Sequence, residues 1–330
     1  MRFYSIDITS PTTGASLLPS SLGGMGITSL LPTGGFNPAA LNVELDIPLA
    51  PFHVPAGSAY VRIWGLGLRD IGNAYDLNGA DISVYGGMSK GLPLADPSQA
   101  RLLVKGQILQ AFGNWIGTDQ SIDLVFYPAT GTATTPMNFV LDWQAGTTLA
   151  SALSNTFATA LPTAKQTINL SPRLVLSHVE TGYWGTLESM AAVLNPLSKS
   201  IITDAGYPGV IISYDGATVI ASDLYGPANP ATAISFQDLV GQPTWREANV
   251  VQIKTVMRGD IDLLDLVTLP QTLITNNAAA FTSFQGQDKN KLTFSGNFNV
   301  IAIHHYGNFR QPDANSWATV LDMTPQLKVA

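Results

Sequence analysis

The chain of 330 residues contains no cysteine, and only 12% of its residues are charged. Without cysteine, disulfide bonds, thiolate zinc sites and a cysteine nucleophile are excluded. Soluble globular domains carry about 25% charged residues, so the charge here is too sparse to cover the surface of a monomer well. Permanent interfaces are poor in charge, which favours a subunit of a lasting assembly over a monomer with a surface rich in Ser, Thr, Asn and Gln.

Apolar targeting segments are also missing from the sequence. The first residues, Met1 to Asp7, lack the apolar run of a secretory signal, and no stretch reaches the ~18 apolar residues of a membrane span. The chain is therefore expected to have no membrane segment and to stay in the cytosol until it is assembled. Its net charge of -7, with 16 scattered Lys and Arg residues, argues against specific nucleic-acid binding.

The first part of the chain has the pattern of β-structure. Residues 11–40 are dense in Pro, Gly, Ser and Thr and are predicted to form a loop or arm. Apolar and polar residues then alternate along 42–49, as in a strand with one buried face. Further strands are expected at 60–64, 81–85, 101–111 and 121–127, and their short spacing favours an antiparallel barrel or sandwich.

The middle of the chain has a different periodicity. Leu149, Leu153 and Phe157 recur every fourth residue, and a second apolar stripe starts at Leu187, so each predicts an amphipathic helix. Thr186 is placed to cap the second helix and Pro196 to end it. Extended segments at 210–213 and 218–222 flank Asp215-Gly216, a pair typical of a type I′ hairpin turn.

Strand patterns return after residue 234, at 250–257, 262–269, 292–298, 300–305 and 317–323. The predicted fold class is mainly β with an α+β module. Its expected domains are a first tube-like β-barrel with an N-terminal arm (1–134), a mixed helix and strand module (135–235), and a second tube-like barrel (236–330). No repeat of identical residues is visible between the two β-regions.

Catalytic and metal-binding patterns are nearly absent. His304 and His305 are neighbours in a strand, so their rings point to opposite faces and cannot share one metal ion. The Gly65-Leu66-Gly67 segment has Asp70 where a dinucleotide loop needs its third glycine. We therefore predict no catalytic residues, no metal site and no cofactor.

Paired carboxylates were considered for glycan cleavage. Asp119 and Asp123 share a strand face but lie ~13 Å apart, which is too far for a retaining glycosidase pair. Asp260, Asp262 and Asp265 lie closer together, where a turn enters a strand. The six tryptophans are spread evenly along the chain, which fits core anchors better than a sugar-binding platform.

Two sets of motifs resemble the baseplate hub proteins of tailed bacteriophages. The first set is Val61-Arg62-Ile63-Trp64, Asp81 to Met88 ("DISVYGGM"), Leu103 to Ile108 ("LVKGQI") and Thr118 to Leu124 ("TDQSIDL"). The second is Asp238 to Trp245 ("DLVGQPTW"), Met257 to Ile261 ("MRGDI") with Leu269-Pro270, and His305 to Arg310 ("HYGNFR") with Trp317-Ala318-Thr319. They occur in the order in which they occur in such hubs, at both ends of the chain.

This resemblance implies a non-enzymatic structural subunit. Hubs of this family form homotrimers in which two similar barrels per chain alternate around an axis. The resulting pseudo-sixfold ring joins a hexameric tail tube to a trimeric tip or spike protein and contacts other baseplate subunits. Genomic DNA passes through the lumen without specific binding, and an acidic lumen would repel its phosphates. The location implied is the virion tail baseplate, assembled in the host cytoplasm, with any wall-degrading activity on a partner chain.

Residues at domain or subunit interfaces are expected at the strand ends that carry the second motif set. They are Trp245, Arg258, Asp260, His305, Arg310 and Trp317. Two other functions stay open: a tail-tip carbohydrate-binding or glycan-degrading protein, and a tail-tube or adaptor protein that forms sixfold rings with one barrel per chain.

Overall fold

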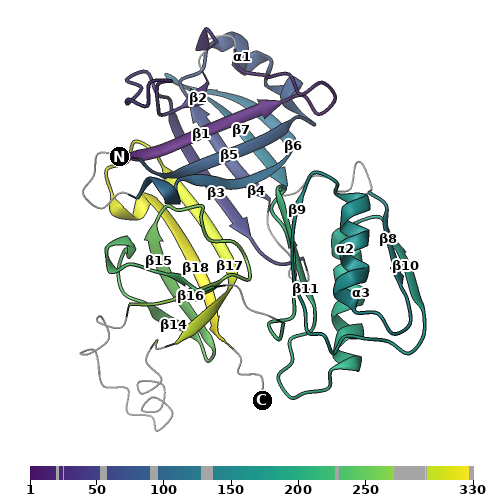
Figure 1. Cartoon of the computed structure of the whole chain (residues 1–330). Helices are drawn as coiled ribbons and strands as arrows, with labels where there is room; N and C mark the ends of the chain where they lie inside the picture. Colours follow the sequence, from purple (N-terminus) through teal and green to yellow (C-terminus); the bar gives the residue numbers. More distant parts are fainter. Residues whose placement is uncertain are drawn as a thin grey trace.

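The computed structural model describes residues 1–19, 22–24, 26–52, 58–89, 96–127, 137–226, 230–270, 294 and 296–326. Its described elements are mainly β-strands in large antiparallel sheets, with three α-helices, which confirms the predicted fold class. Figure 1 shows the N-terminal strands above the C-terminal strands, and a separate layered module beside them.

The N-terminal strands form one curled antiparallel sheet in the order β3-β4-β7-β6-β5-β1-β2. They are β1 (Arg2–Thr9), β2 (Ile27–Thr28), β3 (Asn42–Leu49), β4 (Ala59–Trp64), β5 (Asp81–Met88), β6 (Arg101–Ile116) and β7 (Asp119–Tyr127), with α1 (Leu68–Gly72), η2 (Ala74–Leu77) and η3 (Pro97–Gln99) between them. Every predicted strand of this region is present, and β1 is a strand that the periodicity did not reveal. The Tyr4 hydroxyl donates to the Leu41 carbonyl at 2.7 Å, which draws the two ends of the curl together.

The middle module packs two helices between two small sheets (Figure 1). Its elements are β8 (Phe139–Trp143), α2 (Leu149–Ala160), β9 (Lys165–Asn169), β10 (Glu180–Trp184), α3 (Leu187–Ile201), β11 (Ile211–Tyr214) and β12 (Thr218–Ser222). One sheet has the order β11-β12-β9 and the other pairs β10 with β8. A separate hydrophobic core, which runs from Phe139 to Ala221 and includes the predicted helix stripes, holds these layers together.

Two local predictions in this module need correction. Thr186 does cap α3, since its Oγ1 accepts from the Ser189 amide at 3.2 Å, but Pro196 does not end the helix. The helix continues to Ile201 because the buried stripe of Leu194, Ser198 and Ile202 extends past the proline. That burial offsets the ~3 kcal/mol cost of an interior proline.

The hairpin between β11 and β12 forms as predicted, but its turn differs. Only Gly216 has a positive φ, of 88°. The Asp215 side chain instead accepts from the amides of Ala217 and Thr218, at 2.7 and 2.6 Å. A three-residue loop stabilised by an aspartate therefore replaces the type I′ turn.

The C-terminal strands are β13 (Thr232–Ala233), β14 (Thr244–Glu247), β15 (Val250–Val256), β16 (Leu266–Thr268), β17 (Asn297–Asn308) and β18 (Trp317–Pro325), with η4 (Phe236–Asp238) and η6 (Ala314–Ser316). The strand predicted at 262–269 is shorter, because residues 262–265 form a turn. Of the strand predicted at 292–298, residues 292, 293 and 295 lie outside the described ranges. The 300–305 strand is part of the longer β17.

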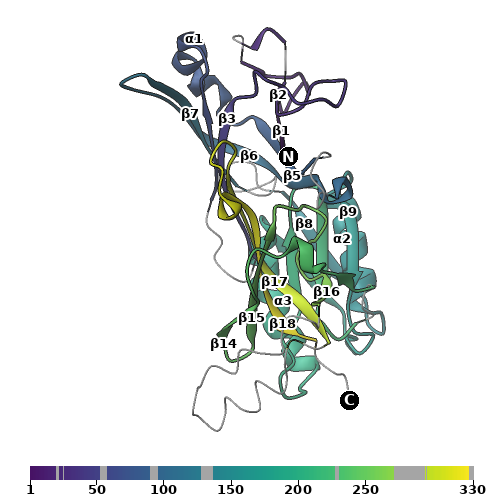
Figure 2. The ribbon, with the colours of Figure 1, turned by 90° about the vertical axis from the view of Figure 1, so that its left-hand side faces the viewer.

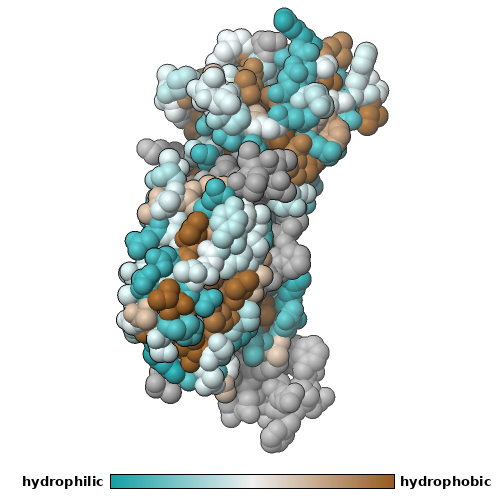
Figure 3. Space-filling view, turned by 90° about the vertical axis from the view of Figure 1, so that its right-hand side faces the viewer, coloured by the Kyte–Doolittle hydropathy of each residue, from teal (hydrophilic) through white to brown (hydrophobic). Residues whose placement is uncertain are grey.

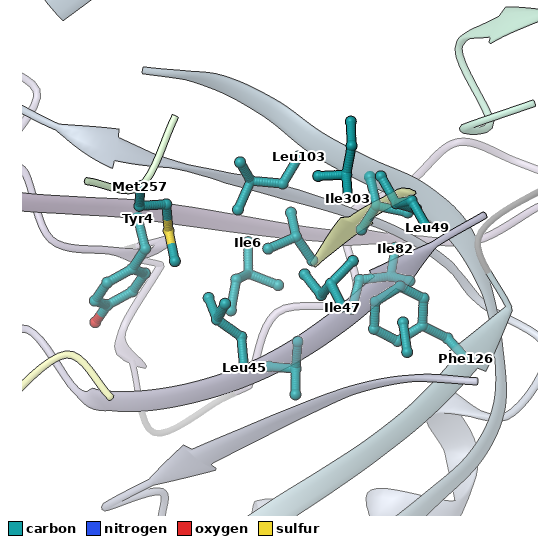
Figure 4. Packing of buried hydrophobic residues seen from close by; sticks show 14 of the residues in the cluster. Tyr4, Ile6, Leu45, Ile47, Leu49, Ile82, Leu103, Phe126, Met257 and Ile303 are labelled. Carbon is teal, nitrogen blue, oxygen red and sulfur yellow. The ribbon is translucent and has the colours of Figure 1, made fainter. Parts of the chain in front are cut away.

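The N-terminal and C-terminal strands share one sheet. Among the described residues β3 pairs with β17 over six residue pairs, and this joins both sets into a 13-stranded sheet. Their cores merge as well: Ile47 and Phe126 of the N-terminal part belong to the same cluster of buried side chains as Ile303 and Met257 of the C-terminal part, and Figure 4 labels all four. The two β-regions expected as separate barrels are thus continuous in both sheet and core.

The two sets of strands also have the same connectivity. Along the sheet the N-terminal order is β3-β4-β7-β6-β5-β1, and the C-terminal order is β14-β15-β18-β17-β16-β13. If the two-residue β2 is left out and the strands of each set are numbered along the chain, both orders read 2-3-6-5-4-1. The one difference is the last pair, which is antiparallel for β1 and β5 but parallel for β13 and β16.

Backbone hydrogen bonds repeat at matching positions of the two sets. Gly79 and Ala80 exchange hydrogen bonds with Ile108, just as Leu264 and Asp265 do with Val300. The register of the β6–β7 pair shifts directly after Ile108, and that of β17–β18 directly after Val300.

Two further features of these sets agree. Gly79 and Leu264 both have a positive φ, of 80° and 67°. The Gly65 amide donates to Gln120, and the Met257 amide makes the corresponding bond to Trp317. We therefore describe the chain as two halves of like topology, the N-terminal half (β1–β7) and the C-terminal half (β13–β18), joined side by side.

Candidate functional site

The seam between the halves is built around the strand pair β3–β17. Polar side chains cross it on one face of the sheet: Asn308 donates to Glu44 Oε1 at 2.8 Å, and His304 contacts Asp46. Leu45, Ile47 and Leu49 point to the other face and are buried in the shared core. The seam is therefore polar on one face and apolar on the other.

Arg2 ties the start of β1 to the end of β17 and the segment after it. Its guanidinium donates to the carbonyl oxygens of Asn308 (2.7 Å) and Phe309 (3.2 Å), and it also contacts those of Gln311 and Asp313. No periodicity marks such a residue, since its partners are backbone groups some 300 positions away. Sequence reasoning missed it for that reason.

The predicted interface residues Arg258 and Asp260 lie in a buried ion cluster. Arg258 is 2% exposed, and its guanidinium donates to both oxygens of Asp260 at 2.7 Å and to Asp238 at 3.1 Å. Asp238 also accepts from the Gln99 side chain, and the Gly259 amide donates to the Gln99 carbonyl. Since Gln99 belongs to the N-terminal half, this cluster contacts both halves of the chain.

Trp317 and Arg310 also reach across to the N-terminal half. The Trp317 indole N–H donates to the Gly87 carbonyl at 2.9 Å, and the ring packs edge-on against Phe309. The Arg310 guanidinium donates to the Ala40 carbonyl. The two side chains thus hold the end of β17 and the start of β18 against the N-terminal half.

His305 and Trp245 stay within the C-terminal half. His305 is 1% exposed, its Nδ1 lies 2.9 Å from Thr319 Oγ1, and burial together with His304 lowers its pKa to about 3. It is therefore a neutral core residue at pH 7. The neighbouring His304 faces solvent, so the two rings point to opposite faces as predicted. Trp245 stacks on Phe294 with ring centroids 5.5 Å apart.

The solvent-exposed face of the sheet, which we call the polar sheet face, runs across both halves without interruption. Cross-strand rows link Tyr306, Asp46 and Tyr60, and next to them Asn308, Glu44, Arg62 and Asp123. Its other ionisable residues include Lys254, His304, Asp322 and Arg246, which donates to Asp322 at 2.6 Å. A pocket of about 510 Å³ opens on this face at the seam, and Glu44, Asp46 and Asp313 are among its lining residues.

Arg62 organises the N-terminal part of the polar sheet face. It binds both carboxylate oxygens of Asp123 at 2.7 Å and lies over the rings of Tyr60 and Trp64, at 5.5 and 5.2 Å from their centroids. Burial tends to raise the pKa of Asp123, but hydrogen bonds from Arg62 and Tyr60 outweigh it and lower that pKa. Burial and the Asp123 charge raise the pKa of Tyr60 to about 12.

The described residues hold no group of three or more His, Asp or Glu side chains placed to bind a metal ion. Of the paired carboxylates considered, Asp260 is engaged by Arg258, and Asp123 by Arg62. Asp262 and Asp265 are half-buried, and burial raises the pKa of both, that of Asp262 to about 6 with added repulsion from Asp215 and Asp265. None of the helices in the described ranges is long and apolar enough to cross a membrane.

Exposed apolar side chains gather at two places. Figure 3 looks onto the middle module and shows apolar patches on its surface, where Val140, Val179 and Tyr183 are at least half exposed. The second place is the β6–β7 hairpin, which projects from the body of the molecule in Figure 2. Trp115 and Ile116 are 63% and 77% exposed there.

No family model and no curated protein matches the sequence. Solved structures with a similar course of the backbone include a tail protein from Neisseria meningitidis MC58, at 8% identity and a TM-score of 0.47, with 97% of this chain and 96% of that chain covered. The 43 kDa tail protein of prophage MuSo2 from Shewanella oneidensis has 8% identity and a TM-score of 0.49, with 99% and 98% covered.

A third similar structure is the E. coli c3393 protein, a component of the type VI secretion system with structural similarity to the T4 bacteriophage tail proteins gp27 and gp5. It has 9% identity and a TM-score of 0.48, with 87% of this chain and 74% of that chain covered. These neighbours are tail and tail-like proteins at low sequence identity.

Proposed function

We propose that this chain is a structural subunit of a phage tail baseplate hub, in which three copies form a ring of six similar units. The observation that carries the proposal is the repeated topology of the two halves. They share strand order, the position of a register shift and several backbone hydrogen bonds, and they lie side by side in one sheet.

A side-by-side repeat of this kind can close into a ring. The halves meet head to tail. An edge of β3 in one half meets an edge of β17 in the other half, and not an edge of β14, which is the counterpart of β3. Repeating such a contact generates a ring or an open filament. Six units from three chains would match a hexameric tail tube on one side and a trimeric tip or spike on the other, as the hub resemblance implies.

The polar sheet face is the proposed lining of the channel through which DNA passes. It spans both halves, so six copies of the unit would present it continuously. Its carboxylates are Glu44, Asp46, Asp123 and Asp322, and its permanent cations are Arg62, Lys254 and Arg246, the last paired with Asp322. This acidic surplus would repel DNA phosphates and prevent them from sticking to the wall.

The other exposed surfaces fit contacts with further tail components. The apolar patch on the middle module lies on its β8–β10 side, away from the large sheet, where tube, spike or other baseplate subunits would bind (Figures 1 and 3). We propose no enzymatic role, since one carboxylate of each candidate set, Asp123 or Asp260, is held in an ion pair by an arginine. The proposed location is the virion tail, after assembly in the host cytoplasm.

Native mass spectrometry of the purified chain, alone and with its tube and tip proteins, tests this proposal. The expected result is a species with the mass of three chains. A species of six chains would favour a tube or adaptor protein with sixfold symmetry. A lone subunit under all conditions, above all one that cleaves a glycan, would contradict the hub proposal.

A further inference from the structure

Several strand edges of the sheet are unpaired in the described part of the chain, among them those of β2 and β13. Two further edges belong to the counterparts of the strands that form the internal seam. One belongs to β14, the last strand in the sheet order, which pairs only with β15. The other belongs to β6: its neighbour β5 pairs with it only from Arg101 to Gln107, and no described strand pairs with that edge at residues 112–116. Exposed strand edges are sites at which proteins add a further strand.

The seam inside the chain shows what such edges bind. Residues Ile303 to Asn308 of β17 lie beyond the segment that pairs with β16, and β3 occupies their edge. The register sets Tyr306 opposite Asp46 and His305 opposite Ile47. Here an edge strand of one half completes the partly covered long strand of the other.

Because the two halves have the same topology, the two open edges can pair with each other in the same way as β3 and β17. In the common strand order β14 takes the place of β3, and β6 takes the place of β17. The register shifts align Val300 with Ile108, which sets Tyr306 at the place of Asn114. Asp46 opposes Tyr60 in β4, and Thr244 opposes Gln252 at the matching position of β15, so Thr244 takes the place of Asp46.

We propose that residues 112–116 of β6 in one copy pair antiparallel with β14 of the next copy, with Asn114 opposite Thr244. This seam between copies repeats the seam inside the chain and makes the sheet continuous around the ring; it rests on the hub proposal. Each copy carries one edge of each kind, so the contact is heterologous and passes from chain to chain.

The side chains at the two edges suit this contact. Phe112, Trp115 and Ile116 are 47%, 63% and 77% exposed on the β6 segment, and pairing would cover them. The β6 segment itself carries no charge, so it does not repel Arg246 and Glu247 of β14. Burial of these apolar side chains gives the seam a driving force that strand hydrogen bonds alone lack.

An engineered disulfide tests the register directly, because the chain has no cysteine of its own. In the double variant Asn114→Cys with Thr244→Cys, oxidation should link neighbouring copies into covalent dimers and closed trimers. The β6–β7 hairpin and β14 lie toward opposite ends of the molecule in Figure 2, so a bond between the two positions within one chain cannot form. Mixing the two single variants should give one heterodimer and no larger species.

The matched control is Asp46→Cys with Tyr306→Cys, the corresponding pair of the internal seam, which should cross-link within a single chain. A second variant, Ile116→Lys, should weaken assembly at least 10-fold, whereas Phe36→Lys, at an exposed apolar position between β2 and β3, should not. Trimers that form without the Asn114–Thr244 cross-link and tolerate Ile116→Lys would overturn this seam and leave the hub proposal standing. Chains that never associate would overturn both.

Discussion

At the scale of single residues, the buried ion cluster around Arg258 is the contact between the halves that depends most on each of its partners. A buried arginine between two carboxylates is stable only while all of its partners are present. Arg258→Ala would leave Asp238 and Asp260 buried without their cation. We expect the free energy of unfolding to fall by about 3–5 kcal/mol.

Chemical denaturation measures this change, and Arg173→Ala is its control. Arg173 pairs with Asp204 in a comparable two-point contact, but both side chains are about half exposed. Exposed ion pairs contribute about 1 kcal/mol or less, so this variant should stay close to the wild type. An equal fall in unfolding free energy for Arg258→Ala and Arg173→Ala would show that burial does not make the Arg258 ion pairs stronger than the exposed Arg173 pair.

Asp262 gives the chain a predicted pH dependence. Burial, with Asp215 and Asp265 nearby, raises its pKa to about 6, above the unfolded value of about 3.9. The folded state then binds more protons than the unfolded state between these values, so the unfolding free energy falls as the pH rises from about 4 to 6. The loss is about 1–3 kcal/mol.

In Asp262→Asn the loss of unfolding free energy with rising pH should be absent. The variant should be more stable than the wild type at pH 7.5, and the two should converge near pH 4, in thermal melts recorded across this range. Asp76→Asn, at an exposed carboxylate, is the control and should follow the wild type. A variant less stable than the wild type at pH 7.5 would contradict the assigned cause.

At the scale of elements, α3 shows a helix whose packing overrides its own sequence. Pro196 lacks an amide hydrogen and so removes one backbone hydrogen bond, yet the helix runs on to Ile201. Pro196→Ala should therefore stabilise the chain by about 1–3 kcal/mol, measured by denaturant unfolding. Lys199→Ala, at an exposed position of the same helix, should change little. Destabilisation by Pro196→Ala would mean that the proline stabilises this segment.

Strands and helices with a clear apolar period were predictable, because each such pattern reflects burial on one face. The strand at Asn42–Leu49 and the helix at Leu187–Ile201 are of this kind. The pairing of β3 with β17 was not predictable, because a contact between segments some 260 residues apart leaves no local pattern in the sequence.

The repeat was hidden for a different reason. It is carried by backbone geometry, so that Gly79 and Leu264 make the same turn with unrelated side chains. Of the predicted interface residues, Arg310 and Trp317 contact the other half, and Arg258 is linked to it through Asp238, whereas His305 is a core residue. That these residues lie at domain or subunit interfaces stays a prediction.

At the scale of the whole molecule, the shared sheet and core imply that the two halves unfold together. Ile47 and Ile303 lie in one cluster, whereas the middle module has its own. In hydrogen exchange the amides of β3 and β17 should therefore open with one common free energy. The β14 edge should exchange faster in the free chain and become protected in the ring. Independent opening of β3 and β17 would contradict the idea of a single cooperative unit.

The central claim is that two halves of one chain stand in for two subunits of a ring. Electron microscopy of the assembled particle, with its symmetry determined from the images, tests this claim most directly. We predict a threefold ring with six similar lobes, in which the lobes alternate between the N-terminal and the C-terminal half. A ring with sixfold symmetry and one chain per lobe, or particles of a single chain, would contradict it.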